Sequence, residues 1–226
     1  RDLHRVDRRQ RQMCIRDSFS PVQSVGRLNY GTASYAAQTF SGLPNGRIVR
    51  IAWNRTDFPG TPFNGSMCTP TEMSLRKAGG TLMLCAQPAK EIAVLSSGTV
   101  ESRDRAVKKE APLSIPLSGK AQDIRLSVLC EKNAPFRFSF LGLTITVDPQ
   151  NSVLNCKEYT MPLFMKGNLV DLRVITDTHA AEFYADQGEA FLCCPHPADY
   201  SRSNLVLSVP QESVMVASLC VSELRR

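Results

Sequence analysis

The chain has 226 residues, of which 42% are hydrophobic and 21% are charged, and a formal net charge of +6. A chain of this length can bury a sizeable core in one or two domains, and this composition is ordinary for a globular protein. No apolar run approaches the roughly 20 residues that a membrane-spanning helix needs, so we expect no membrane partner.

The first 18 residues carry half of the net charge, because six arginines and three aspartates there give +3 of the total of +6. A basic arm of this kind is typical of segments that contact nucleic acid. Residues 13–18, Met-Cys-Ile-Arg-Asp-Ser, instead look like the translation of a transposon-end adapter used in sequencing libraries. A segment of this origin has no part in the fold of the natural protein. We therefore interpret residues 1–18 as a non-biological head and expect no nucleic-acid partner.

Short alternating or apolar runs predict β-strands along nearly the whole remaining chain, and almost no segment has a helical period. Turn clusters rich in Gly, Asn, Asp and Pro separate these runs, for example at 44–46 and 148–151. Many short strands at a spacing of about ten residues predict an all-β sandwich, barrel or propeller. The expected strands are 47–53, 81–85, 113–117, 124–130, 136–140, 143–147, 172–176, 189–193, 205–209 and 214–219.

The composition changes near residue 95. Residues 96–109 are polar and charged and have no apolar periodicity. We therefore expect a linker or an exposed helical turn over 96–111, which joins one module over 19–95 to a second over 112–226.

The eight cysteines show no C-x-x-C pair, and the three histidines do not cluster, so we expect no structural zinc site and no cofactor. Most of the cysteines lie in apolar runs, where a free cysteine behaves as a small buried hydrophobe. Adjacent Cys193 and Cys194 would point to opposite faces of a strand.

Five short motifs follow one another in the first module. In this order and at these spacings they resemble the last propeller blade of glycoside hydrolase family 32, whose enzymes cleave fructosides such as sucrose, levan and inulin. Segment 171–189 of the second module is similar to the signature of the β-sandwich that follows the propeller in that family. The resemblance implies an all-β fold, with the last blade of a five-bladed β-propeller over 19–95 and a C-terminal β-sandwich over 112–226. The five motifs lie at 30–40, 46–53, 62–65, 70–75 and 88–92.

Members of this family are retaining glycosidases, which need two carboxyl groups about 5 Å apart across the scissile bond. The family's nucleophile lies in a Trp-x-Asn-Asp-Pro motif, a transition-state aspartate in Arg-Asp-Pro, and the acid/base in Glu-Cys. None of these three motifs occurs in the sequence. The resemblance therefore implies the C-terminal part of an enzyme that cleaves β-fructofuranosidic bonds. We expect no catalytic residue in the chain and no activity of the chain alone.

Carried over by position, Tyr35 falls on the tyrosine of the family's Asp-Phe-Tyr-Ala motif and Trp53 on the tryptophan that ends the next strand. The resemblance implies that both line the sugar pocket, because aromatic faces pack against the apolar C–H patches of a furanose. The alternative is that both are core aromatics of a blade. Ala33 and Ser34 replace the family's aspartate and phenylalanine, and Asn54 replaces a common methionine, so the preferred fructoside stays open.

The remaining polar candidates are interpreted as structural. Glu72 and Glu91 match acidic positions of the family's blade at which an ion pair is more typical than catalysis, and Asn64 belongs to a turn. His179 and Glu182, three residues apart, would lie on opposite faces of a strand, so we do not expect them to bind one metal ion together. We expect this pair on the exposed polar face of a sheet.

Two functions remain open at this point. The first is the C-terminal part of a fructoside hydrolase whose partner is a fructose-containing oligo- or polysaccharide. The second is a non-enzymatic carbohydrate-binding β-sandwich module. The motif series ahead of the sandwich favours the first, because a free-standing module has no use for it. A lone blade should also expose apolar surface and an unpaired edge.

Overall fold

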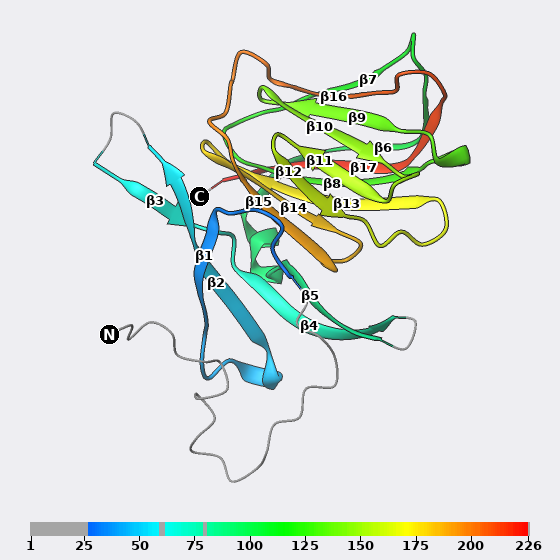
Figure 1. Ribbon diagram of the computed structural model, residues 1–226. Helices are drawn as coiled ribbons and strands as arrows, with labels where there is room; N and C mark the ends of the chain where they lie inside the picture. Colours follow the sequence, from blue (N-terminus) through cyan, green and yellow to red (C-terminus); the bar gives the residue numbers. More distant parts are fainter. Residues whose placement is uncertain (1–26, 59–61, 79–80, 226) are drawn as a thin grey trace.

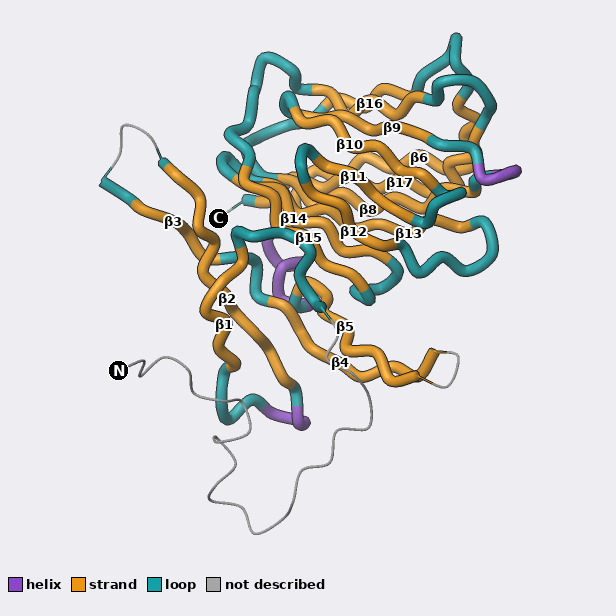
Figure 2. Tube along the Cα trace, in the orientation of Figure 1, coloured by secondary structure: helices purple, strands orange, loops and turns teal. Residues whose placement is uncertain are grey.

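The computed structural model describes residues 27–58, 62–78 and 81–225 and consists almost entirely of β-strands (Figure 1). This confirms the all-β expectation. The helical elements of the described residues are three short 3₁₀ turns, Pro44–Gly46, Lys90–Leu95 and Glu131–Asn133 (Figure 2). No helix in this part of the chain has the length and apolar character to cross a membrane. The expected non-biological head, 1–18, lies outside the described residues.

The first sheet is an antiparallel path in the order β1-β2-β4-β5, and β3 pairs with the far end of β2. Neighbours along the path are also consecutive in the chain apart from β3, as in an up-and-down meander. This arrangement is compatible with the propeller blade expected over 19–95, which stays a prediction. The strands are β1 (Ser34–Thr39), β2 (Ile48–Asp57), β3 (Asn64–Met67), β4 (Thr71–Ala78) and β5 (Thr81–Pro88).

The expected C-terminal β-sandwich is confirmed, because two further six-stranded sheets pack face to face. The second sheet has the order β12-β11-β10-β9-β16-β7, and its strands are β7 (Leu113–Pro116), β9 (Phe136–Phe140), β10 (Leu143–Asp148), β11 (Val153–Cys156), β12 (Tyr159–Pro162) and β16 (Asn204–Ser208). The third sheet has the order β15-β14-β13-β8-β17-β6, and its strands are β6 (Ser96–Val107), β8 (Gln122–Leu129), β13 (Leu169–Thr176), β14 (Ala180–Ala185), β15 (Ala190–Pro195) and β17 (Val214–Leu224).

The sandwich core lies between the second and third sheets. Alternate residues of β9 point into it, so that Phe136, Phe138 and Phe140 are at most 1% exposed. The Phe138 ring lies 6.2 Å from the ring of Phe140 and 6.5 Å from that of Phe183, which comes from β14 across the core. A large aromatic cluster therefore joins the two sheets.

The linker expected over 96–111 is wrong for Ser96–Val107, which forms the twelve-residue strand β6. This strand pairs with β17 nearly end to end, from Val107 opposite Val214 to Ser96 opposite Leu224. It is the edge strand of the third sheet, and most of its side chains are exposed. A strand that is exposed on both faces has no apolar alternation, and this explains why its sequence pattern did not indicate a strand.

The first sheet packs against the outer face of β13, β14 and β15, so the third sheet is the middle layer of the molecule (Figure 1). The backbone N–H of Tyr30 donates to Phe191 O at 2.9 Å, and that of Ala86 donates to Gly188 O at 2.8 Å. Gly188 has φ +85, and an added Cβ would overlap Ala86 O, so only glycine permits this close approach. A small apolar cluster fills the interface, with buried members Ala33, Ala52, Cys68, Ile175, Tyr184, Phe191 and Cys193.

Apolar exposure is concentrated on the first sheet and on the turn that follows it. Of the thirteen large hydrophobic side chains exposed in the described part of the chain, ten lie between residues 35 and 95. This agrees with the expectation that a sheet of this kind, standing without neighbours, exposes apolar surface. The ten are Tyr35, Phe40, Ile48, Phe63, Met67, Leu75, Leu82, Leu84, Val94 and Leu95.

Candidate functional site

The two aromatic residues expected to bind sugar lie side by side on the first sheet. Tyr35 of β1 and Trp53 of β2 are directly opposite in the antiparallel register, so their side chains share one face. Their ring centroids are 6.4 Å apart with an interplanar angle of 63°, an edge-to-face contact. Tyr35 is 57% exposed and Trp53 is half-buried. The structure therefore brings the predicted pair together on an accessible face.

Strand β3 holds the indole of Trp53 in place. Met67 of β3 is opposite Trp53 in the register, and Gly65 approaches the ring from the same strand. Gly65 has φ +86, and a Cβ added there would overlap the indole Nε1 and lie 2.8 Å from Asn54 O. A glycine is therefore required here both for its left-handed backbone and for the space that the indole occupies.

Arg55 belongs to the same face, and we did not expect it from the sequence. It lies two residues after Trp53 on β2, so alternation directs both side chains to one side. Its guanidinium lies 4.9 Å from the centroid of the Tyr35 ring, and its Nη2 donates to Thr32 O at 2.8 Å. The spacing of two from a predicted site residue was the signal that could have identified it. The face thus combines two aromatic rings with a fixed cation.

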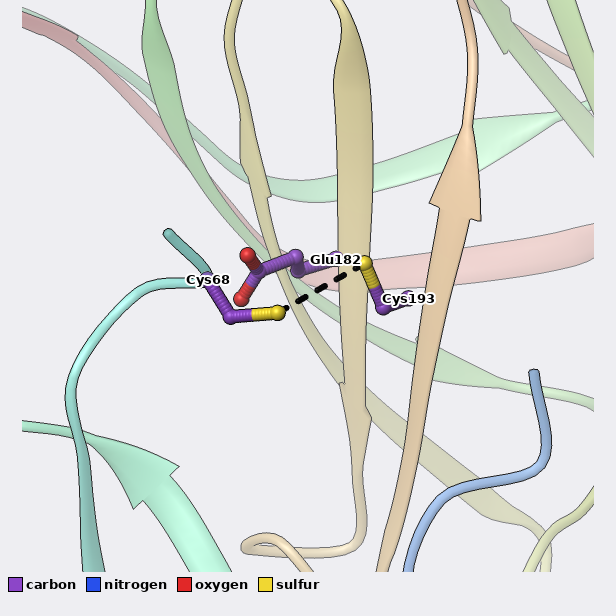
Figure 3. A group of neighbouring side chains, drawn as sticks. All are labelled: Cys68, Glu182 and Cys193. Atoms are coloured by element: carbon purple, nitrogen blue, oxygen red, sulfur yellow. Dashed lines mark hydrogen bonds between the residues drawn. The ribbon is translucent and has the colours of Figure 1, made fainter. Parts of the chain in front are cut away.

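Glu182 was expected on an exposed polar face, and this expectation is wrong. Its side chain is buried under the first sheet, with the residue 5% exposed, beside Cys68 and Cys193 (Figure 3). The backbone N–H of Thr69 donates to its Oε1 at 2.9 Å, and the Tyr184 hydroxyl donates to its Oε2 at 2.5 Å. Burial raises the pKa of Glu182 to about 7. The charge of Glu182 suggested an exposed face, and nothing in the local sequence indicated that the first sheet covers this face of β14.

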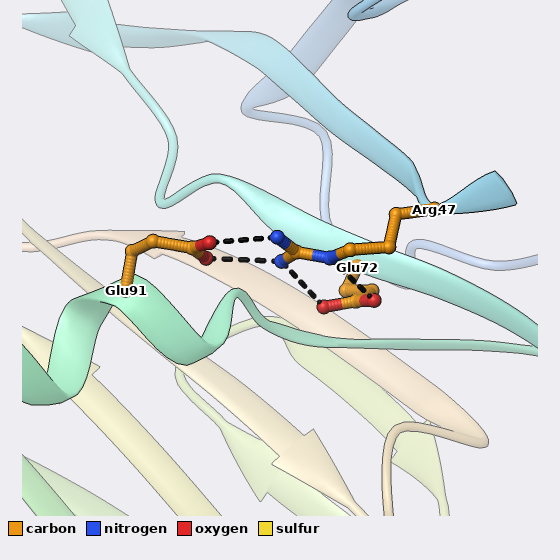
Figure 4. A network of polar contacts seen from close by, with 3 residues as sticks. All are labelled: Arg47, Glu72 and Glu91. Atoms are coloured by element: carbon orange, nitrogen blue, oxygen red, sulfur yellow. Dashed lines mark hydrogen bonds and ion pairs between the residues drawn. The ribbon is translucent and has the colours of Figure 1, made fainter. Parts of the chain in front are cut away.

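Glu72 and Glu91 form the structural ion pairs that we expected, and Arg47 is their common partner (Figure 4). The guanidinium donates to both oxygens of Glu72 at 2.9 and 2.8 Å, and to both oxygens of Glu91 at 2.7 and 3.0 Å. Hydrogen bonds from Arg47 lower the pKa of Glu72 and are the main cause that lowers the pKa of Glu91 to about 2. The double fork ties the start of β2 to β4 and to the 3₁₀ turn after β5.

A separate open cleft of about 730 Å³ lies between β4–β5 and the third sheet. Neither Tyr35 nor Trp53 lines it. Most of its charged lining residues are engaged with side chains outside the lining; Arg173, for example, donates to both oxygens of buried Asp123 at 2.9 and 2.8 Å. The charged side chains that line the cleft are Glu72, Arg76, Lys90, Arg125, Asp171 and Arg173.

Among known proteins, the chain is similar in sequence to a bacterial levanase. The chain is 24% identical over 216 residues to a levanase from Bacillus sp. (strain L7), a match that covers 81% of this chain and 24% of the levanase. No family model matches the sequence. The chain therefore spans about a quarter of the length of this relative.

Solved structures share the fold over nearly the whole chain. A β-fructofuranosidase from Schwanniomyces occidentalis superposes with a TM-score of 0.74 at 16% identity, over 92% of this chain and 51% of that chain. An exo-inulinase from Aspergillus awamori superposes with a TM-score of 0.73 at 17% identity, over 91% of this chain and 46% of that chain. These similarities support the resemblance to glycoside hydrolase family 32. The chain matches the C-terminal part of these relatives and spans about half of the two solved chains.

Proposed function

We propose that the chain is the C-terminal part of a retaining glycoside hydrolase that cleaves β-fructofuranosidic bonds in sucrose, levan or inulin. The relatives named above are a levanase, an exo-inulinase and a β-fructofuranosidase, which supports a fructose-containing oligo- or polysaccharide as the partner of the whole enzyme. The nucleophile and the acid/base would come from blades whose sequence lies outside these 226 residues.

The observation that carries this proposal is the concentration of exposed apolar side chains on the first sheet. In a closed propeller each blade buries its faces against the blades on either side. One face of the first sheet packs on the sandwich, yet ten large hydrophobic side chains between 35 and 95 remain exposed. Neighbouring blades would bury this apolar surface. We therefore assign residues 19–95 to the last of five blades, and the segment from 96 to 226, which includes strand β6, to the sandwich that packs on it.

In this arrangement Trp53 and Tyr35 would line one side of the sugar pocket. The rings would pack against the furanose, and the Arg55 guanidinium beside them would offer N–H donors to sugar hydroxyls. These residues would position the fructosyl unit, while the carboxylates of the other blades act on its glycosidic bond. The role of this chain is therefore substrate positioning rather than bond cleavage.

The test compares the chain alone with the same chain extended by the coding sequence that precedes it in its source DNA. The extended protein should release fructose from sucrose or levan, and the 226-residue chain should release none. Trp53→Ala in the extended protein should raise KM or lower kcat, whereas Tyr200→Ala, an exposed aromatic change on the sandwich, should leave both unchanged. Fructose release by the chain alone would contradict the proposal.

A further inference from the structure

Three side chains of the kinds that bind metal ions converge between the first sheet and the sandwich (Figure 3). Cys68 follows β3, Glu182 lies on β14 and Cys193 lies on β15. All three residues are buried, and their ligand atoms lie within 4.8 Å of one another. Cys68 lies more than a hundred residues before Glu182 and Cys193 in the chain, so no spacing in the sequence indicates the group.

The spacing of the two sulfurs fits a shared metal ion better than a disulfide. The Sγ atoms of Cys68 and Cys193 are 4.0 Å apart. A tetrahedral zinc ion with Zn–S bonds of about 2.3 Å holds two thiolates about 3.8 Å apart. A disulfide would need about 2.05 Å between the same atoms. Only a small adjustment would therefore bring both sulfurs into contact with one zinc ion.

The carboxylate of Glu182 is oriented by two donors but has no cationic partner. Thr69 N–H and the Tyr184 hydroxyl each donate to one of its oxygens, and outer hydrogen bonds of this kind orient carboxylates that bind metals. Glu182 takes part in none of the ion pairs found among residues 27–58, 62–78 and 81–225. A buried carboxylate without a cation is costly, and a bound divalent ion would remove that cost.

A fourth ligand is available from the first sheet. Asn54 of β2 is 1% exposed, and its Oδ1 lies 3.6 Å from Cys193 Sγ, a normal separation for two ligands of one metal ion. The Thr56 hydroxyl donates to the same Oδ1 at 2.6 Å and fixes its direction. The group therefore offers two thiolates, one carboxylate and one amide oxygen.

We propose that Cys68, Glu182 and Cys193 bind one zinc ion, with Asn54 Oδ1 in the fourth position. Asn54 lies on β2 and Cys68 directly follows β3, while Glu182 and Cys193 lie on strands of the sandwich, so the ion joins the first sheet to the sandwich. Binding releases the two thiol protons, and the carboxyl proton where it is present, to solvent; no electron is transferred. The site is structural, because all four positions are filled by protein. It does not depend on the proposed function.

A second pair of cysteines serves as an internal control. Cys194, next to Cys193, faces the sandwich core, and its Sγ lies 3.5 Å from Cys156 Sγ. This confirms that the adjacent cysteines point to opposite faces of β15. The metal-ligand group found among the described residues does not include the Cys156–Cys194 pair. Both cysteine pairs therefore bring two thiols close together, but in the part of the chain that the structure describes only the Cys68–Cys193 pair has a carboxylate, that of Glu182, beside it.

The experiment uses cobalt, whose spectrum reports thiolate ligation. The 226-residue chain carrying Cys14→Ser, which removes the cysteine outside the described residues, is stripped of metal under reducing conditions and titrated with Co²⁺. We expect one Co²⁺ per chain, with a thiolate-to-cobalt charge-transfer band and tetrahedral d–d bands that zinc abolishes. Zinc should also raise the urea concentration at which Trp53 fluorescence reports unfolding, because the ion binds only the folded chain.

Variants assign the ligands. Cys68→Ser and Cys193→Ser should each weaken the charge-transfer band and lower the cobalt affinity by about 100-fold or more, and Glu182→Gln by about 10- to 100-fold. Cys194→Ala and Cys220→Ser, which remove thiols outside the group, should leave spectrum and affinity unchanged.

Three results would overturn the proposal. The first is the absence of a cobalt band in the chain that retains all four ligands, a measurement that does not depend on whether the variants fold. The second is an unchanged spectrum in Cys68→Ser or Cys193→Ser. The third is a Cys68–Cys193 disulfide in peptides mapped from protein purified without reductant.

Discussion

Gly65 offers a test of how Trp53 is positioned on the exposed face of the first sheet. Gly65→Ala introduces two separate problems. The residue has φ +86, where an L-amino acid is strained by about 1–2 kcal/mol, and its new Cβ would overlap the indole Nε1. If the indole moves to make room, the loss of packing should cost about 1–3 kcal/mol more, as in overpacked cores.

Gly46→Ala separates these two contributions. Gly46 also has a positive φ, +65, but no heavy atom lies within 4 Å of the position of its added Cβ. It should therefore show the backbone strain alone. The difference between the two variants is then the displacement of the indole, about 1–3 kcal/mol, or about 5- to 150-fold in the unfolding equilibrium constant.

The assay is intrinsic fluorescence, since Trp53 is the one tryptophan in the sequence. Urea unfolding followed at this residue gives the free energy of unfolding, and acrylamide quenching gives the exposure of the indole. Gly65→Ala should shift the emission to longer wavelength and increase quenching, and Gly46→Ala should change neither. Equal destabilisation by both variants with unchanged emission would refute the packing of Trp53 against β3.

Three further predictions follow from the described contacts. Arg47→Met should raise the pKa of Glu91, measured by carboxyl NMR, from about 2 toward its ordinary value of 4.5. The stability that the ionised Glu91 contributes above pH 4.5, and loses as the pH falls toward 2, should then disappear. An unchanged pKa would contradict the role of the Arg47 hydrogen bonds to Glu91. Phe138→Ala should cost about 3–5 kcal/mol in urea unfolding followed by circular dichroism, and a loss below 1 kcal/mol would contradict its central place in the sandwich core. Leu75→Lys combined with Leu84→Glu, a cross-strand pair on β4 and β5 that is 68% and 47% exposed, should reduce self-association in light scattering, and unchanged association would show that this surface is not responsible.

The sandwich could be predicted well because its strands obey simple alternation. Leu172, Val174 and Thr176 were expected on one face of a strand, and all three are buried in β13. Their neighbour Ile175, on the opposite face, is also buried, at 8% exposed, because the first sheet covers that side. The period of a strand reveals its faces, but it does not reveal which distant segment covers each face.

Most of the features that the sequence did not predict lie at the interface between the first sheet and the sandwich. Glu182 was placed on an exposed face because it is charged, and its burial depends on Cys68 and Thr69, more than a hundred residues earlier in the chain. The structural interpretation of Glu72 and Glu91 was right, yet their common partner Arg47 could not be identified from spacing. These contacts join segments that are distant in the sequence, and a local sequence pattern cannot show which distant segments pack together.

The central proposal is that this chain is the C-terminal part of a family 32 enzyme whose catalytic carboxylates are encoded upstream. The most direct measurement is the DNA sequence that precedes the codon for residue 19 in the source genome. We expect the reading frame to continue upstream and to encode, in this order, Trp-x-Asn-Asp-Pro, Arg-Asp-Pro and Glu-Cys segments. An in-frame stop codon directly upstream, or a continuous frame without these segments, would contradict the claim.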